Sequence, residues 1–181
     1  LVIGGAGYIG SHVALELCKN GHSVAVFDNL STGHLINIDS RVDFIQGNIL
    51  NNDDLKDVFN GKFEAVFHFA ALKAAGESML EPGKYATSNI TGTINILNKM
   101  LENNIKYFIF SSTAAVYGMP EYLPVDEKHP INPINFYGYT KLEIENLLGW
   151  YSKLKGMRFA SLCYFNAAGY DIDGEINGLE R

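Results

Sequence analysis

A tyrosine and a lysine stand four residues apart, at Tyr137 and Lys141, in a stretch with the apolar spacing of a helix. Residues four apart share one helix face, so both side chains can reach a single cleft. Lowering a tyrosine pKa from about 10 by about three units, as a neutral-pH base requires, needs roughly 4 kcal/mol. A cation about 5 Å away supplies about 3 kcal/mol at an effective dielectric constant near 20. The spacing therefore predicts an acid–base pair in which Lys141 lowers the pKa of Tyr137.

Hydroxyl side chains precede this pair. Ser111-Ser112-Thr113 follows the apolar run Tyr107–Phe110. A hydroxyl at the end of a strand can hydrogen-bond the substrate oxygen whose proton Tyr137 removes or returns. Y-x-x-x-K alone is a weak signal, because tyrosine and lysine meet by chance at this spacing on many amphipathic helices. The other motifs in the sequence therefore decide whether the Y-x-x-x-K pattern indicates a catalytic pair.

A glycine-rich turn, Gly4–Gly10 (GGAGYIG), follows the first apolar run and precedes a helical pattern. Its G-x-x-G-x-x-G spacing is a variant of the dinucleotide fingerprint, in which glycines let a pyrophosphate approach the free amides of a helix N-terminus. The second apolar run ends at Asp28, where a carboxylate can accept both ribose hydroxyls and would repel a 2′-phosphate. The turn and Asp28 predict bound NAD rather than NADP. The nicotinamide cation would supply the rest of the stabilisation of a Tyr137 phenolate.

Apolar runs and helical patterns alternate along the chain and can position these residues. The expected strands are Leu1–Ile3, Ser23–Phe27, Val42–Gln46, Ala65–Phe69, Tyr107–Phe110 and Arg158–Tyr164. The expected helices are Ile9–Asn20, Asp53–Phe59, Tyr85–Asn103 and Tyr137–Lys155, with a long loop at Pro120–Pro133. Continuous apolar runs are typical of parallel strands buried on both faces, and repeated strand–helix units predict an α/β fold with a doubly wound parallel sheet. Ligands bind at the carboxyl ends of such strands.

The composition excludes some classes of partner. A net charge of −6 and a pI near 5.3 disfavour nucleic acid and anionic membranes, which attract basic patches. We see no signal peptide and no apolar run long enough to span a bilayer. Cys18 and Cys163 lie in apolar stretches and are expected to be reduced, which favours a cytoplasmic location. No histidine stands at metal-ligand spacing from Cys or Asp, so no metal site is expected.

Several segments together carry a family resemblance. The chain resembles the extended short-chain dehydrogenase/reductase superfamily over all 181 residues, and within it most closely the nucleotide-sugar 4-epimerases. The matching segments are Gly4–His12 (GGAGYIGSH), Asp28–Gly33 (DNLSTG), His68–Lys73 followed by Gly76–Ser78, Ser111–Gly118 (SSTAAVYG) and Tyr164–Gly169 (YFNAAG). The resemblance implies an NAD-binding Rossmann fold that corresponds to roughly the N-terminal half of a family enzyme.

The resemblance also implies roles for individual residues. Thr113, Tyr137 and Lys141 match the catalytic set, and Asn166 joins Thr113 and Tyr137 as a UDP-sugar contact. The cofactor-binding residues that it implies are Gly4, Gly7, Tyr8, Ile9, Gly10, Asp28, Asn29, Ser31, Thr32, Gly33, Asn48, Ile49, Phe69, Ala70, Ala71, Lys73, Asn89, Tyr137, Lys141, Tyr164 and Phe165. Asn48 departs from the family, which usually has Asp at the adenine.

The ends of the chain lead us to expect a piece of a longer protein. No Met begins it, and only Leu1–Ile3 precede the first glycine, whereas a typical strand has about 5–6 residues. By the resemblance, residues 1–170 form the NAD-binding domain, and residues 171–181 begin a substrate-binding part that is largely missing.

The resemblance implies that the intact protein interconverts UDP-glucose and UDP-galactose, by transient oxidation of C4 with tightly bound NAD and Tyr137 as base. One alternative is another NAD-dependent UDP-sugar epimerase or a dehydratase. Dehydratases of this superfamily carry Asp-Glu after the catalytic Thr, whereas Ala114-Ala115 follow Thr113 here. Another alternative, for these residues alone, is an NAD-binding domain without activity. A homodimer through the helices at Tyr85–Asn103 and Tyr137–Lys155 is also implied.

Overall fold

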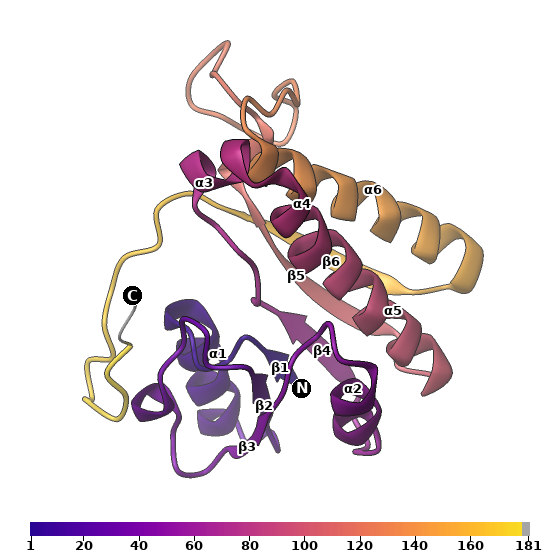
Figure 1. The fold of residues 1–181 in the computed structure, drawn as a ribbon. Helices are drawn as coiled ribbons and strands as arrows, with labels where there is room; N and C mark the ends of the chain where they lie inside the picture. Colours follow the sequence, from indigo (N-terminus) through magenta and orange to yellow (C-terminus); the bar gives the residue numbers. More distant parts are fainter. Residues whose placement is uncertain (179–181) are drawn as a thin grey trace.

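The computed structural model describes residues 1–178, and its centre is a six-stranded parallel sheet (Figure 1). The strands are β1 (Val2–Ile3), β2 (Ala25–Asp28), β3 (Asp43–Gln46), β4 (Ala65–His68), β5 (Tyr107–Thr113) and β6 (Arg158–Tyr164). Their order across the sheet is β3-β2-β1-β4-β5-β6, so the direction of winding reverses between β1 and β4. Sheets of this order open a ligand crevice at the carboxyl ends of the strands, beside the reversal.

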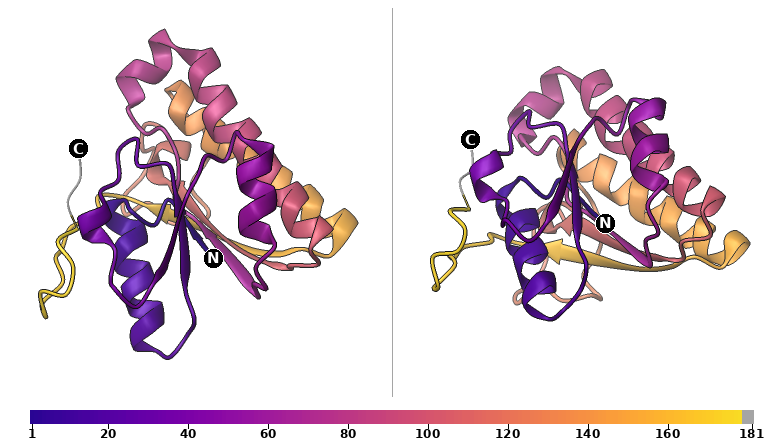
Figure 2. Two further views of the ribbon diagram at one scale, coloured as in Figure 1. Left: turned by 60° about the horizontal axis from the view of Figure 1, so that its bottom comes forward. Right: turned by 90° about the horizontal axis from the view of Figure 1, so that it is seen from below.

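Helices cover both faces of the sheet (Figure 2). The helical segments are α1 (Tyr8–Lys19), η1 (Leu35–Asn37), α2 (Asn52–Phe59), α3 (Ala75–Leu80), α4 (Pro82–Tyr85), η2 (Ala86–Thr91), α5 (Gly92–Glu102), η3 (Ala114–Val116) and α6 (Phe136–Lys155). The larger core, which includes Ile96 and Leu148, lies under α2, α5 and α6. The smaller core, which includes Ala14 and Val26, lies under α1. Apolar side chains on both sides bury β1 and β2 completely, as their continuous apolar runs predict.

The expected doubly wound parallel sheet is confirmed, and three of the differences from the expected elements bear on the site. Strand β5 runs past Phe110 to Thr113, because it pairs with β6 as far as Tyr164. The expected helix Tyr85–Asn103 contains a π-helical stretch, η2, between α4 and α5. Helix α3 has no counterpart among the expected helices, since six residues are too few to show an apolar period.

The segment after β6 returns to α1, so that the yellow end of the chain lies beside the indigo beginning in Figure 1. The Tyr8 hydroxyl donates to the Gly169 carbonyl at 2.8 Å, and Lys19 pairs with Asp173 and Glu175. The predicted boundary at residue 170 falls inside this segment and stays a prediction, and residues 179–181 lie outside the described part. Among the described residues, no helix is both long and apolar enough to cross a membrane.

Candidate active site

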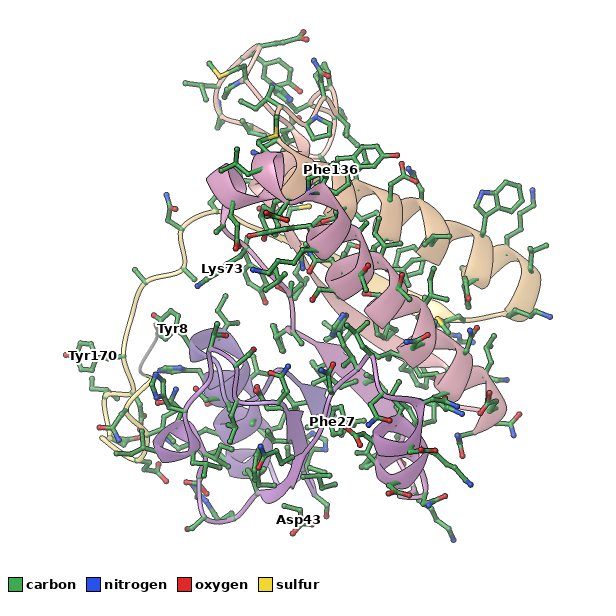
Figure 3. The ribbon with its side chains drawn as sticks, in the orientation of Figure 1. Tyr8, Phe27, Asp43, Lys73, Phe136 and Tyr170 are labelled. Atoms are coloured by element: carbon green, nitrogen blue, oxygen red, sulfur yellow. The ribbon has the colours of Figure 1, made fainter. Side chains whose placement is uncertain are left out.

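A cleft of about 520 Å³ opens at the carboxyl ends of the strands, where the winding reverses. It is lined by every site residue that the sequence predicts except Asn89, which is buried behind it. Figure 3 shows Tyr8 and Lys73 on opposite sides of its mouth. The fold therefore gathers into one place residues that lie up to 162 positions apart in the chain, from Gly4 to Asn166.

The glycine turn between β1 and α1 is packed too tightly for side chains. Gly4 has φ +79°, and a Cβ atom there would lie 2.4 Å from the Ala70 backbone nitrogen. A Cβ on Gly10 would lie 2.3 Å from the Gly4 carbonyl oxygen. Gly7 caps α1 without any side-chain hydrogen bond, and the first turn of α1 has no acidic residue. The residues of this helix end, Gly7–Gly10, line the cleft, and the free amides of a helix N-terminus are suited to bind the pyrophosphate of a dinucleotide.

Asp28 connects the glycine turn to the loop after β2. Its Oδ2 accepts the Ala6 N–H at 3.0 Å, and its Oδ1 accepts the Leu30 N–H at 2.8 Å. Each carboxylate oxygen has a second lone pair, so Asp28 can still accept a ligand hydroxyl from within the cleft. Asp28 thus stabilises the turn through these two hydrogen bonds and can also accept a hydrogen bond from a ribose hydroxyl. The adjoining Asn29, Ser31, Thr32 and Gly33 line the same end of the cleft.

Tyr137 lies at the start of α6, where Ser78 and Thr113 orient it. Its backbone N–H donates to the Ser78 hydroxyl at 3.0 Å, so α3 holds the helix end that carries the tyrosine. Thr113, at the end of β5, hydrogen-bonds the Tyr137 side chain. Burial raises the pKa of Tyr137, and the Thr113 hydrogen bond opposes that rise. The spacing of Tyr137 and Lys141 along the chain shows the attraction of a cation but not the burial of Tyr137, which favours the neutral phenol.

Lys141 reaches the same cleft from one turn further along α6. Its Nζ donates to the Ser111 carbonyl at 2.7 Å and lies 4.7 Å from the centre of the Phe110 ring and 6.0 Å from that of Tyr137. Only 2% of the residue is exposed. Burial lowers the pKa of its ammonium to about 7, and the Glu145 carboxylate opposes this fall. The predicted pair is therefore assembled, but the burial of both members works against their charged forms.

Asn89 connects the segment after β4 to α6. Its side chain accepts the Leu72 N–H at 2.9 Å, and donates to the Leu72 carbonyl at 3.0 Å and the Thr140 hydroxyl at 3.1 Å. Thr140 in turn donates to the Tyr137 carbonyl at 2.7 Å. Asn89 lies in η2, and π-helical stretches often occur at functional sites. Its side chain holds the backbone that lines the cleft rather than facing the cleft itself.

His68, at the end of β4, belongs to the core behind the site. Its Nε2 lies 3.0 Å from the Thr93 hydroxyl, which itself donates to the Asn89 carbonyl, so Nε2 carries the hydrogen. Burial, together with the Lys141 charge, lowers the pKa of His68 to about 3 and keeps the ring neutral. His68 is thus a buried core histidine, whose Nδ1 has no partner among the described residues.

Some residues that line or support the cleft lie outside the set of site residues predicted from the sequence. Ser78 and Asn135, which hold the start of α6, lie in α3 and in the loop before α6. The capping pattern of Asn135 before a helix could have been found from the sequence. Lining residues outside the predicted set are Ile3, Phe27, Gly47, Leu72, Ser88, Ser111, Ser112 and Ala167.

Comparison with known proteins matches residues 1–179 to the NAD dependent epimerase/dehydratase family. The chain belongs to that family. Membership fits the structure, because the family's cofactor needs the close backbone approach that Gly4 and Gly10 provide and a helix end free of acidic side chains. It also agrees with the resemblance drawn from the motifs.

Individual members of the family are also similar to this chain. A UDP-glucose 4-epimerase of Lactobacillus helveticus is 46% identical over 177 residues, which cover 97% of this chain and 54% of that enzyme. The UDP-glucose 4-epimerase of Brucella ovis in complex with NAD has a TM-score of 0.94 and 43% identity, over 99% of this chain and 55% of that one. The Bifidobacterium longum enzyme, in complex with NAD⁺ and UDP, has a TM-score of 0.91 and 33% identity, over 97% and 55%. The chain spans about half the length of the curated relatives it matches.

Proposed function

We propose that this chain binds NAD and, in the intact protein, forms part of a UDP-glucose 4-epimerase. The observation that carries the proposal is the meeting of Thr113, Tyr137 and Lys141 in the cleft that the glycine turn opens. Similarity to UDP-glucose 4-epimerases at 46% identity supports the substrate class. Complexes of relatives with NAD support the cofactor.

In the proposed reaction, the chain's residues hold and deprotonate the sugar. Tyr137 takes the proton from the sugar 4-hydroxyl and later returns it, while the Thr113 hydroxyl orients that oxygen. Lys141 stabilises the Tyr137 phenolate and binds the nicotinamide ribose. Bound NAD supplies a reversible hydride acceptor for C4. Asn166, exposed at the rim of the cleft, is proposed to contact the UDP-sugar.

Two neighbouring functions are less well supported. A dehydratase would need an acid and a base after the catalytic Thr, but that position is the apolar turn η3, Ala114–Val116. Another UDP-sugar epimerase would use the same cleft, and activity on a panel of UDP-sugars distinguishes it from the proposed enzyme. An NAD-binding domain without activity remains the alternative for these 181 residues by themselves.

A homodimer and a cytoplasmic location belong to the same proposal. The outer side of α6 supports the dimer, because Trp150 and Leu154 are 57% and 66% exposed there. Exposed apolar side chains that gather on one helix are typical of surfaces that pair.

The test is a Tyr137→Phe variant of the intact protein. We expect its turnover of UDP-galactose to fall by about 10²–10⁴-fold, because the phenol oxygen that exchanges the proton is gone. Its affinity for NAD, measured by calorimetry, should change little, because the phenyl ring still fills the site. Turnover at the parent rate would refute the assignment of Tyr137 as the base.

A further inference from the structure

Among the described residues, none gives the buried ammonium of Lys141 a directly bonded counter-charge. Its hydrogen bond goes to a neutral carbonyl, that of Ser111, and its other neighbour is the face of the Phe110 ring. A cation removed from water is costly unless an opposite charge compensates it. Among the described residues, the carboxylate whose charge acts on Lys141 is that of Glu145, one helical turn further along α6.

Glu145 is held in place from the sheet. The Ser112 hydroxyl, at the next-to-last position of β5, donates to Glu145 Oε1. The Cys163 thiol of β6 lies 3.7 Å from the same oxygen. Ser112 and Cys163 are register partners, so their side chains share the sheet face that α6 covers. Two strands and one helix thus fix the position of this carboxylate.

We propose that Glu145 is a positioning residue whose anchored carboxylate keeps Lys141 charged beside Tyr137, with Ser112 holding that carboxylate at its distance. Lys141 carries the catalytic role under the proposed function, so the kinetic part of the inference rests on that function. The electrostatic part does not, because it concerns the charge of Lys141 in the folded chain.

Among the described residues, no group near the two side chains other than Glu145 has a charge that acts on Lys141. His68, behind Lys141 on β4, is neutral, since burial lowers its pKa to about 3. Burial raises the pKa of Cys163, and raises that of Tyr117, beside it, to about 12. Both therefore stay protonated near neutral pH. The remaining charged group on this side is Glu127 of the long loop, which acts on Tyr117.

The first experiment titrates Lys141 in the intact protein. Lysine is labelled with ¹³C, the Lys141 signal is assigned with a Lys141→Met variant, and its midpoint is followed by NMR. Glu145→Gln keeps the shape and the acceptor oxygen for Ser112 but removes the charge. We expect the midpoint to fall by about one to two pH units, the order of effect that one unit charge has on a nearby group at an effective dielectric constant of about 20.

The matched control is Glu143→Gln, which removes the same charge from the same helix two residues earlier. It should leave the Lys141 midpoint within a few tenths of a pH unit of the parent. Equal midpoints in Glu145→Gln and the parent would overturn the proposal, and so would an equal shift in both variants. This readout needs no UDP-sugar, so it stands even where the proposed substrate fails.

Two further variants keep the proposal testable if Glu145→Gln folds poorly. Ser112→Ala removes the anchor and should shift the midpoint in the same direction by a smaller amount. Glu145→Asp retains the charge and should titrate close to the parent, which a purely structural role of the glutamate would not predict. In kinetics, the acid-to-neutral pH profile of kcat should move in Glu145→Gln by the same number of pH units as the Lys141 midpoint, with KM little changed. If the Lys141 midpoint shifts but the pH profile of kcat does not, the kinetic part of the proposal is refuted and the electrostatic part stands.

Discussion

The two halves of the sheet build their parts of the cleft by different means. On the side of β1, β2 and β3, the lining is rich in glycines, and Gly4, Gly10 and Gly33 leave no room for a Cβ atom. On the side of β4, β5 and β6, it consists of side chains whose charge depends on burial, above all Lys141 and Tyr137. Under the proposed function, the first half would bind the cofactor through amides and the Asp28 carboxylate, and the second half would control protonation.

This difference explains why the halves respond differently to change. A backbone cradle is held by steric fit, so a single methyl group disrupts it. A buried pair is held by hydrogen bonds from α3, η2 and β5, so its chemistry can change while its shape persists. Substitutions can therefore separate the loss of steric fit in the backbone half from a change of protonation in the side-chain half.

The largest effect on NAD binding is expected from Gly10→Ala in the backbone half. The added Cβ would lie 2.3 Å from the Gly4 oxygen and 2.8 Å from the Gly5 Cα, and backbone cannot move aside cheaply. We expect the Kd for NAD, measured by calorimetry, to rise at least about 100-fold, or about 2.7 kcal/mol. Gly149→Ala on α6 is the control, because nothing lies within 4 Å of its added Cβ. It should bind NAD as the parent does and be more stable by about 0.5–1 kcal/mol. Parent-like NAD affinity in Gly10→Ala would show that the turn tolerates a side chain.

In the side-chain half, Lys141→Met should change the pH dependence of stability. The folded pKa of Lys141 is about 7, below its ordinary value of 10.5, so the unfolded chain binds more protons between these values. The parent's free energy of unfolding should therefore rise with pH from about 7 to 10 relative to the variant, by up to about 1.4 kcal/mol per pH unit. Urea unfolding without ligand measures the difference. If the two curves stay parallel across this range, Lys141 is not buried as a strained cation.

A smaller effect, on the preference between NAD and NADP, is expected from Asp28→Asn. Asp28 is a charged residue that lines the backbone half of the cleft. The amide removes the repulsion of a 2′-phosphate and weakens the ribose contact, so the preference for NAD over NADP should narrow by about tenfold. Titration with both dinucleotides measures it. Asp43→Asn removes an equal charge from the exposed start of β3 and should leave the preference unchanged. An unchanged preference in Asp28→Asn would leave the residue with its turn role alone.

The sequence predicted the backbone half more completely than the side-chain half. The bounds of α1 and β2 agree with the expected ones within a few residues, and the glycine turn and Asp28 line the cleft as expected. Both are local features, in which a turn and a helix end follow from residue types adjacent in the chain. Helix α3 and the π-helical stretch were not expected, because Ser78 and Asn89 are held by contacts with α6, far away in sequence.

By itself, the sequence determined the parallel α/β fold, the family and the pair of residues four apart on α6, since apolar periodicity, glycine spacing and helical geometry are all local. Only the tertiary structure decided how deeply that pair is buried, and therefore the direction in which its two pKa values shift. Burial raises the pKa of Tyr137 and lowers that of Lys141, the reverse of the direction that a pair in open contact would take. The reason is that desolvation depends on everything packed around a charge, including Phe110, Ser112 and Glu145, and no spacing along the chain encodes that sum.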